Sequence, residues 1–174
     1  MERMTLVPIG AIEPEILVQL KQSLEQTYPS VVEISPQMQK PDWAYNPRRR
    51  QYLAPLILAA INESAAEGKT LGVADVDLYA PGLNFIFGQA DIKRGRAVIS
   101  LCRLRQEYYG LAQDKELFSL RAIKEAIHEI GHSYGLMHCP HEACVMHFSN
   151  SLADTDRKED SLCQKCRSKL WSAP

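Results

Sequence analysis

The sequence has few long hydrophobic runs and almost no net charge. Its longest uninterrupted apolar run, residues 53–61, includes Pro55 and is far shorter than the roughly 20 residues that span a bilayer. Lys and Arg number 20 against 21 Asp and Glu, so the formal net charge of −1 provides no whole-molecule field toward nucleic acid or an anionic membrane. We therefore expect no nucleic-acid partner and no membrane partner.

The chain also lacks the marks of a secreted protein. Its apolar stretch 4–12 is interrupted by Pro8 and Gly10 and followed by Glu13 and Glu15, with no small-residue cleavage pattern. A cytoplasmic location is the expectation. Because that compartment is reducing, the closely spaced members of the five cysteines are better interpreted as metal ligands than as disulfides.

What is present is the composition of an ordinary globular domain. The 174 residues are 45% hydrophobic and 24% charged, which suits one hydrophobic core and excludes wholesale disorder. Gly88 lies inside one predicted strand, where it suits an exposed edge better than a central position. Periodicity predicts strands at 5–9, 31–34, 71–78, 84–90 and 97–104 and a loop at 36–50. It predicts helices at 14–24, at 51–66 and from a start near Asp114 or Ser119 to Tyr134.

Histidine is confined to one window near the C-terminus. All five histidines lie between residues 128 and 147, and two of them, His128 and His132, are one helical turn apart on the same face. Gly135 can take the left-handed conformation that ends a helix, so that the chain returns His138 to the same place. Three imidazoles leave a tetrahedral zinc ion with one open position, in which the pKa of a bound water falls to about 7.

Glu129 directly follows the first of these histidines. Its carboxylate would lie beside the zinc-bound water, where it can accept the proton of that water and later deliver it to a leaving amine. The pattern therefore predicts a zinc-dependent peptidase. Two alternatives remain open: a zinc-stabilised module that binds peptides or partners without cutting them, and a structural zinc closed by His141 or His147 as a fourth ligand.

The complete spacing, His-Glu-x-x-His-x-x-Gly-x-x-His followed by a methionine, is the metzincin signature. Four cysteines flank the methionine, and with these positions the segment 128–166 resembles the archaemetzincins. A looser resemblance covers 71–104. The cysteines are Cys139, Cys144, Cys163 and Cys166.

The resemblance implies an α+β, zincin-like fold, with a twisted, mostly parallel sheet, an antiparallel edge strand, an active-site helix and a small zinc-stapled C-terminal subdomain. By the same resemblance, residues 1–135 form the catalytic subdomain and 136–174 the C-terminal one. Met146 would be the Met-turn beneath the metal. A peptide or protein substrate would lie along the edge strand at Phe87, Gly88, Gln89 and Ala90.

The cysteine quartet also has a physical reading of its own. Four thiolates make a closed tetrahedral site, so the resemblance and the spacing together give two Zn²⁺ per chain, one catalytic and one structural. Two disulfides or a redox C-x-x-C remain as alternatives. Cys102, alone in an apolar strand, is expected to be a small core residue. The run Arg48–Arg50 is expected to be a solvated loop, and a monomer is favoured.

Overall fold

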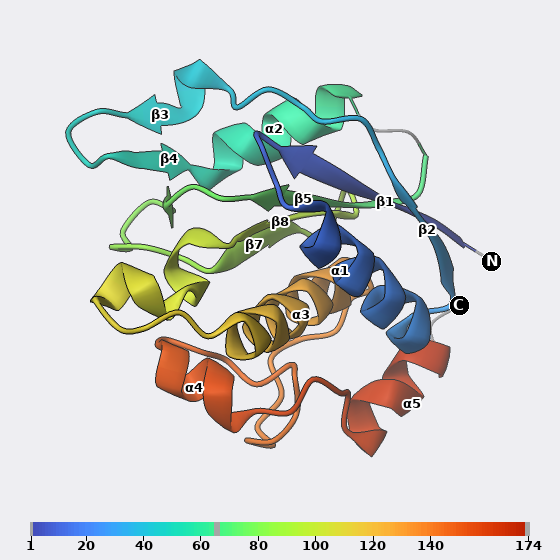
Figure 1. Cartoon of the computed structure of the whole chain (residues 1–174). Coiled ribbons are helices and arrows are strands. Elements are labelled where there is room, and N and C mark those ends of the chain that lie inside the picture. The colour runs from blue at the N-terminus through green and yellow to red at the C-terminus, as the bar shows by residue number, and fades with distance from the viewer. Residues whose placement is uncertain (1, 65–66, 173–174) are drawn as a thin grey trace.

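The computed structural model describes residues 2–64 and 67–172, and its centre is a five-stranded sheet with the order β2-β1-β5-β8-β7. Four strands are parallel, and β7 pairs antiparallel with β8 at one edge (Figure 1). This confirms the predicted mixed fold with an antiparallel edge strand. The strands are β1 (Glu2–Ile9), β2 (Ser30–Ile34), β5 (Lys69–Ala74), β7 (Gly88–Asp91) and β8 (Arg96–Ser100).

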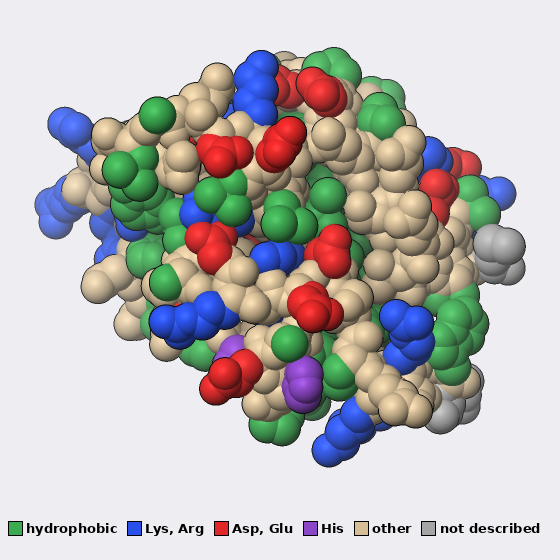
Figure 2. All heavy atoms as spheres, turned by 60° about the horizontal axis from the view of Figure 1, so that its bottom comes forward, with side chains coloured by type: hydrophobic (Ala, Val, Ile, Leu, Met, Phe, Trp, Pro, Cys, Tyr) green, Lys and Arg blue, Asp and Glu red, His purple; other side chains and the backbone are tan. Residues whose placement is uncertain are grey.

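Helices cover both faces of the sheet. The helix α2 (Ala54–Ser64) lies on one face, and α1 (Pro14–Thr27) and α3 (Lys115–Ser133) lie on the other (Figure 1). Two short helices, α4 (Leu152–Arg157) and α5 (Gln164–Ser172), lie beyond α3. No helix in the described ranges is long and apolar enough to cross a membrane. Acidic and basic side chains are interspersed over the face seen in Figure 2.

The larger of two apolar clusters joins the sheet, α1, α3 and the C-terminal tail. It contains Leu6 and Leu71 of the sheet together with Ile127 of α3, and also Val145 and Leu170 of the tail. The tail therefore shares the core of the N-terminal part. The division into subdomains at residue 135 stays a prediction.

The second predicted helix begins later than expected. Residues Gln51–Leu53 form β4, which pairs antiparallel with β3 (Tyr45–Asn46) and parallel with β6 (Leu78–Tyr79) in a small second sheet. The start at 51 was therefore wrong, and the predicted loop 36–50 contains β3 and a 3₁₀ turn, Asp42–Ala44. Pairing with a strand about 25 residues away overrides the local helical pattern here. Positions 65 and 66 lie outside the described residues.

The predicted strands between 71 and 104 are shorter than expected. β5 ends at Ala74, and Leu78 belongs to β6 in the other sheet. Residues 84–87 precede β7 instead of forming part of it, and β8 ends at Ser100. Cys102 lies in the 3₁₀ helix Cys102–Leu104 and is only half-buried, so its expected place in a core strand was wrong. A second 3₁₀ helix spans Gln106–Tyr109.

Both ends of α3 are fixed by capping groups. Asp114 accepts a hydrogen bond from the backbone N–H of Leu117 (2.9 Å) at the start. At the end, Gly135 has a φ of 80°. Its N–H donates to the His132 carbonyl (2.9 Å) and that of Leu136 to the Gly131 carbonyl (3.0 Å), the pair of bonds that defines a Schellman motif. The predicted turn at Gly135 is confirmed.

Replacing Gly131 by Ala should destabilise the fold, although Ala is the better helix former by about 1 kcal/mol. A Cβ at this position would collide with Met146 Sδ and lie 3.1 Å from Tyr28 Oη. We expect a loss of about 1–3 kcal/mol in the free energy of unfolding, measured by denaturant titration. Ser119→Ala, in the same helix, is the control and should be neutral or stabilising. Equal effects of the two variants would contradict close packing at Gly131.

Candidate metal centre and active-site cleft

The structure brings the three predicted histidines together. His128 and His132 lie on α3, and His138 follows the turn, with ring centroids 4.7, 4.9 and 5.3 Å apart. One ligand nitrogen from each lies within 4.8 Å of the others. His141 and His147 do not join this group among the described residues. The Nδ1 atom of His147 is instead bonded to the carbonyl of Cys139 (2.8 Å).

The hydrogen bonds of these rings favour a cation between them. His128 Nδ1 lies 2.9 Å from the Val145 carbonyl oxygen, and His132 Nδ1 lies 2.7 Å from that of Leu136. Because a carbonyl only accepts, both Nδ1 atoms donate, and each Nε2 keeps a lone pair. These two lone pairs face each other at 3.1 Å. Two nitrogens on one tetrahedral zinc lie roughly 3.3 Å apart, so the donor set fits that ion.

The imidazoles are held in the neutral form that binds metals. Burial is the largest cause in each case: the pKa of His128 lies well below its ordinary value, and those of His132 and His138 are also lowered. The positive charge of Lys158 acts in the same direction on all three. Little free energy is therefore needed to remove protons from the imidazoles before a cation binds.

Glu129 is buried beside the histidines, against the edge strand. A Cβ on Gly88 of β7 would lie 2.6 Å from Glu129 Cγ and 2.8 Å from Oε1, so the missing side chain makes room for this carboxyl group. Burial, followed by the negative charge of Glu125, raises the pKa of Glu129 to about 8. A divalent cation among the imidazoles would favour the carboxylate and lower that pKa.

A buried ion pair lies one helical turn behind Glu129. Lys158 Nζ is 3.2 Å from Glu125 Oε1, with side-chain exposures of 0% and 4%. The hydroxyl of Thr155 also donates to Glu125 Oε1 (3.1 Å). Nothing in the spacing of the sequence pointed to Lys158. Glu125 could have been identified from the sequence, because it precedes Glu129 by four residues and therefore lies on the same face of the helix.

A cleft of about 400 Å³ opens over the histidines and Glu129. Residues 83–88 and Ala90 form one wall, and Phe148, Ser149 and Asn150 contribute to the opposite side. Of the four residues predicted to line a substrate strand, Phe87, Gly88 and Ala90 line this cleft. Gln89 instead lines a separate pocket on the side of α2.

The four predicted cysteines form a second candidate metal centre. Their Sγ atoms lie within 4.8 Å of one another, and those of Cys139 and Cys163 are 3.8 Å apart. All are free, so the alternative of two disulfides is not what the structure contains. The backbone N–H of Cys166 lowers the pKa of Cys163 to about 7, whereas burial raises the pKa of Cys144 and of Cys166. Such a cluster of thiols suits a closed zinc site.

Met146 has no solvent exposure, directly follows Val145 and packs against Gly131 of α3. Its backbone carbonyl accepts from the N–H of Cys139 (2.9 Å). Met146 thus lies against the helix that carries two of the histidines, and its role as the methionine turn stays a prediction.

Three imidazoles that suit zinc, next to a buried glutamate and an exposed sheet edge, define the class of zinc metallopeptidases. The model of Peptidase family M54 matches residues 59–172. The chain belongs to this family and is a zinc metallopeptidase. The relatives to which it is similar are archaemetzincins.

Two archaemetzincins and two crystal structures are similar to this chain over at least nine tenths of their own length. The archaemetzincin of Methanocaldococcus jannaschii is 46% identical over 97% of this chain and 92% of its own, and that of Pyrococcus furiosus is 45% identical over 95% and 90%. The crystal structure of archaemetzincin from Archaeoglobus fulgidus has 39% identity and a TM-score of 0.83, covering 96% of this chain and 99% of its own. That from Methanopyrus kandleri has 37% identity and a TM-score of 0.85, covering 98% and 93%.

Lys158→Met should strongly destabilise the protein, because it leaves the carboxylate of Glu125 buried without its partner. We expect a loss of about 3–5 kcal/mol in the free energy of unfolding at pH 7. The double variant Glu125→Gln/Lys158→Met removes both charges and should recover most of that loss. Denaturant titration of the three proteins checks this. A double variant less stable than Lys158→Met would contradict the proposed origin of the effect.

Proposed function

We propose that this peptidase holds its catalytic zinc with His128, His132 and His138 and uses Glu129 as general base and then general acid. The facing Nε2 lone pairs of the first two histidines carry this proposal. A zinc ion held by these three imidazoles would supply Lewis acidity that makes water a nucleophile near neutral pH and polarises the scissile carbonyl.

The protein's own groups supply the remaining steps. The Val145 and Leu136 carbonyls fix the orientation of two imidazoles, and the wall 83–88 excludes bulk water from Glu129. The Glu129 carboxylate takes the proton from the attacking water and delivers it to the nitrogen of the leaving amine.

The substrate strand is proposed to pair with the outer edge of β7. Gln89 pairs with Val98 of β8, and the Phe87 carbonyl accepts from the Ser100 N–H (2.8 Å). Because antiparallel hydrogen bonds alternate, the backbone groups of Gly88 and Ala90 then point outward. An extended peptide can bind them by strand addition. Of the predicted residues Phe87, Gly88, Gln89 and Ala90, we therefore propose that Gly88 and Ala90 carry the main-chain contacts.

The cysteine quartet is proposed to hold a second, structural zinc, which gives two Zn²⁺ per chain. Four sulfur ligands leave no open position, so this metal would clamp the tail onto α3 without taking part in the chemistry. Membership of a peptidase family disfavours the alternative of a binding module without turnover. The metzincin assignment, the cytoplasmic location, the monomeric state and the absence of nucleic-acid and membrane partners stay predictions.

Glu129→Gln should abolish hydrolysis, since an amide cannot accept the proton of the attacking water. Zinc should remain at the histidines, because Glu129 is not one of its proposed ligands. We expect kcat for a fluorogenic peptide to fall by about 10²–10⁴-fold. Glu116→Gln, exposed in the first turn of the same helix, is the matched control and should keep full activity. Undiminished cleavage by Glu129→Gln would remove this residue from the mechanism.

Metal analysis should find two zinc ions per chain in the intact protein and one in Cys163→Ala. Cys163 is not among the residues that line the cleft over the histidines, so the remaining zinc should be the one that a chelator removes together with peptidase activity. Cys102→Ala, which changes a cysteine outside the quartet, should keep both ions. An unchanged count of two in Cys163→Ala would overturn the structural-zinc assignment.

A further inference from the structure

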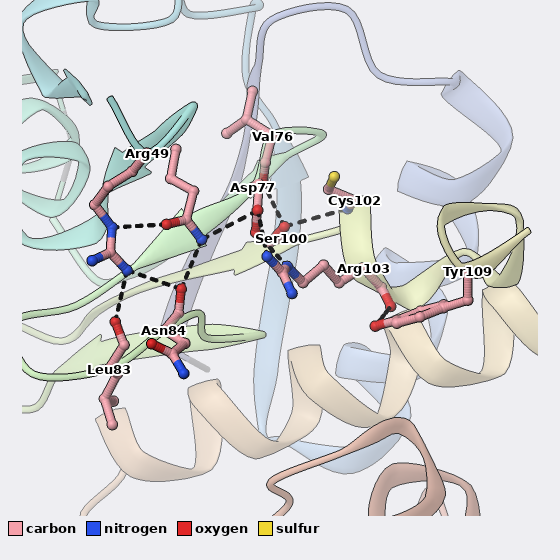
Figure 3. Close-up of polar contacts among 10 residues, drawn as sticks. Arg49, Val76, Asp77, Leu83, Asn84, Ser100, Cys102, Arg103 and Tyr109 are labelled. Carbon is pink, nitrogen blue, oxygen red and sulfur yellow. Dashed lines mark hydrogen bonds and ion pairs between the residues drawn. The ribbon is translucent and has the colours of Figure 1, made fainter. Parts of the chain in front are cut away.

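Three arginines, Arg48–Arg50, lie at the turn between β3 and β4, and the side chain of Arg49 binds a distant segment of the protein. The backbone N–H groups of Arg48 and Arg49 both donate to Asn46 Oδ1, which shapes the turn. The Arg49 guanidinium lies over the Tyr79 ring, 4.2 Å from its centroid, while its Nη2 donates to the carbonyls of Leu83 (2.9 Å) and Asn84 (3.0 Å) (Figure 3). All three arginines are exposed, as expected for a solvated loop, and the hydrogen bonds of the Arg49 side chain to Leu83 and Asn84 are an additional feature of that loop.

Gln51 connects this arginine to the sheet. Its side chain is 5% exposed, its Oε1 accepts from Arg49 Nε (2.9 Å), and its Nε2 donates to the Asn84 carbonyl (2.8 Å) and to Asp77 Oδ2 (3.2 Å). Both lone pairs of the Asn84 carbonyl are thus used by side chains. A substrate strand therefore finds no free backbone acceptor at Asn84.

Arg103 completes the group from the other side. Its guanidinium makes two hydrogen bonds to Asp77, at 2.7 and 2.8 Å, and lies 4.3 Å from the centroid of the Phe85 ring (Figure 3). Phe85 in turn packs edge-on against Phe87, with ring centroids 5.2 Å apart. Both aromatic rings line the cleft over the metal centre.

We propose that Arg49, Gln51, Asp77 and Arg103 form a clamp that positions the cleft wall 83–87 for substrate binding. Pairing with strands reaches the wall at the bridge between Leu78 and Ile86 and at the hydrogen bond from the Ser100 N–H to the Phe87 carbonyl, so it does not fix residues 83–85. In the clamp, side-chain donors bind the backbone carbonyls of Leu83 and Asn84, which no neighbouring strand within the described residues binds. A substrate strand can therefore pair with the edge strand only as far as Asn84. These are positioning residues, since none of them lines the cleft.

This inference rests on the proposed function, because the wall matters only if a peptide binds beside it. His128, His132 and Glu129 lie on α3 and His138 follows its last turn, and none of the clamp's hydrogen bonds described above involves these four residues. Loss of the clamp should therefore weaken binding and leave the chemical step nearly intact, which separates KM from kcat.

The test compares Arg49→Met and Gln51→Leu with the matched control Arg48→Met. Steady-state cleavage of a fluorogenic peptide should show KM raised about tenfold in both clamp variants, equivalent to about 1.4 kcal/mol, with kcat within about twofold. Arg48→Met should match the wild type, and Arg49→Lys, which keeps one cationic donor, should recover part of the loss. Unchanged KM in both clamp variants, despite a lower melting temperature, would reduce the network to a structural role and overturn the proposal.

A second measurement does not depend on turnover. Hydrogen–deuterium exchange should become faster at the amides of 83–87 in Arg49→Met and Gln51→Leu, and should stay unchanged in α3. Binding of the same peptide to these variants in a Glu129→Gln background should weaken in parallel. If wild-type protein cleaved nothing, the proposed function would fail while the exchange result still decided whether the clamp fixes the wall. Unchanged exchange at 83–87 would overturn the clamp itself.

Discussion

The structure depends on the burial of one polar face of α3 between the edge of the sheet and the C-terminal tail. Glu125, His128 and Glu129 are each less than a tenth exposed, although all three are polar or ionisable. Such burial is costly unless every group has a partner. Here Lys158 partners Glu125 and the Val145 carbonyl partners His128, while Gly88 leaves the space that Glu129 occupies.

The two candidate metal centres are connected through a few backbone groups. Val145, whose carbonyl orients His128, lies between Cys144 and Met146, and Cys139 directly follows His138. The N–H of Cys139 donates to the Met146 carbonyl. Because the cysteines lie in the same short segment as these backbone groups, the packing of the thiol cluster also positions the carbonyl that orients His128. The tail thus contributes both His138 and the hydrogen-bond partner of a second histidine.

Local patterns in the sequence predicted the elements nearest the chemistry better than those around it. The α3 helix, its glycine stop and the convergence of three histidines follow from spacing and from backbone chemistry within about ten residues. The elements β4 and β6 were missed, because each is too short to show a period and is held by a partner distant in the chain. The contacts of Arg49 were missed for a related reason, since a run of exposed arginines carries no sign of which member binds the carbonyls of a distant segment.

The sequence by itself determined which atoms meet at the histidines, because ligand spacing on a helix and across one turn is a local property of the chain. It also showed two cysteine pairs, but the folding of the tail brings Cys139 and Cys163, which are 24 residues apart, together. Only the tertiary structure decided what surrounds them. Two contacts to α3, that of Lys158 with Glu125 and that of Gly88 with Glu129, come from segments far from this helix in sequence. The side chains that bind the carbonyls of residues 83 and 84 also come from a distant segment. Long-range packing fixes these contacts, and no periodicity within a segment encodes them.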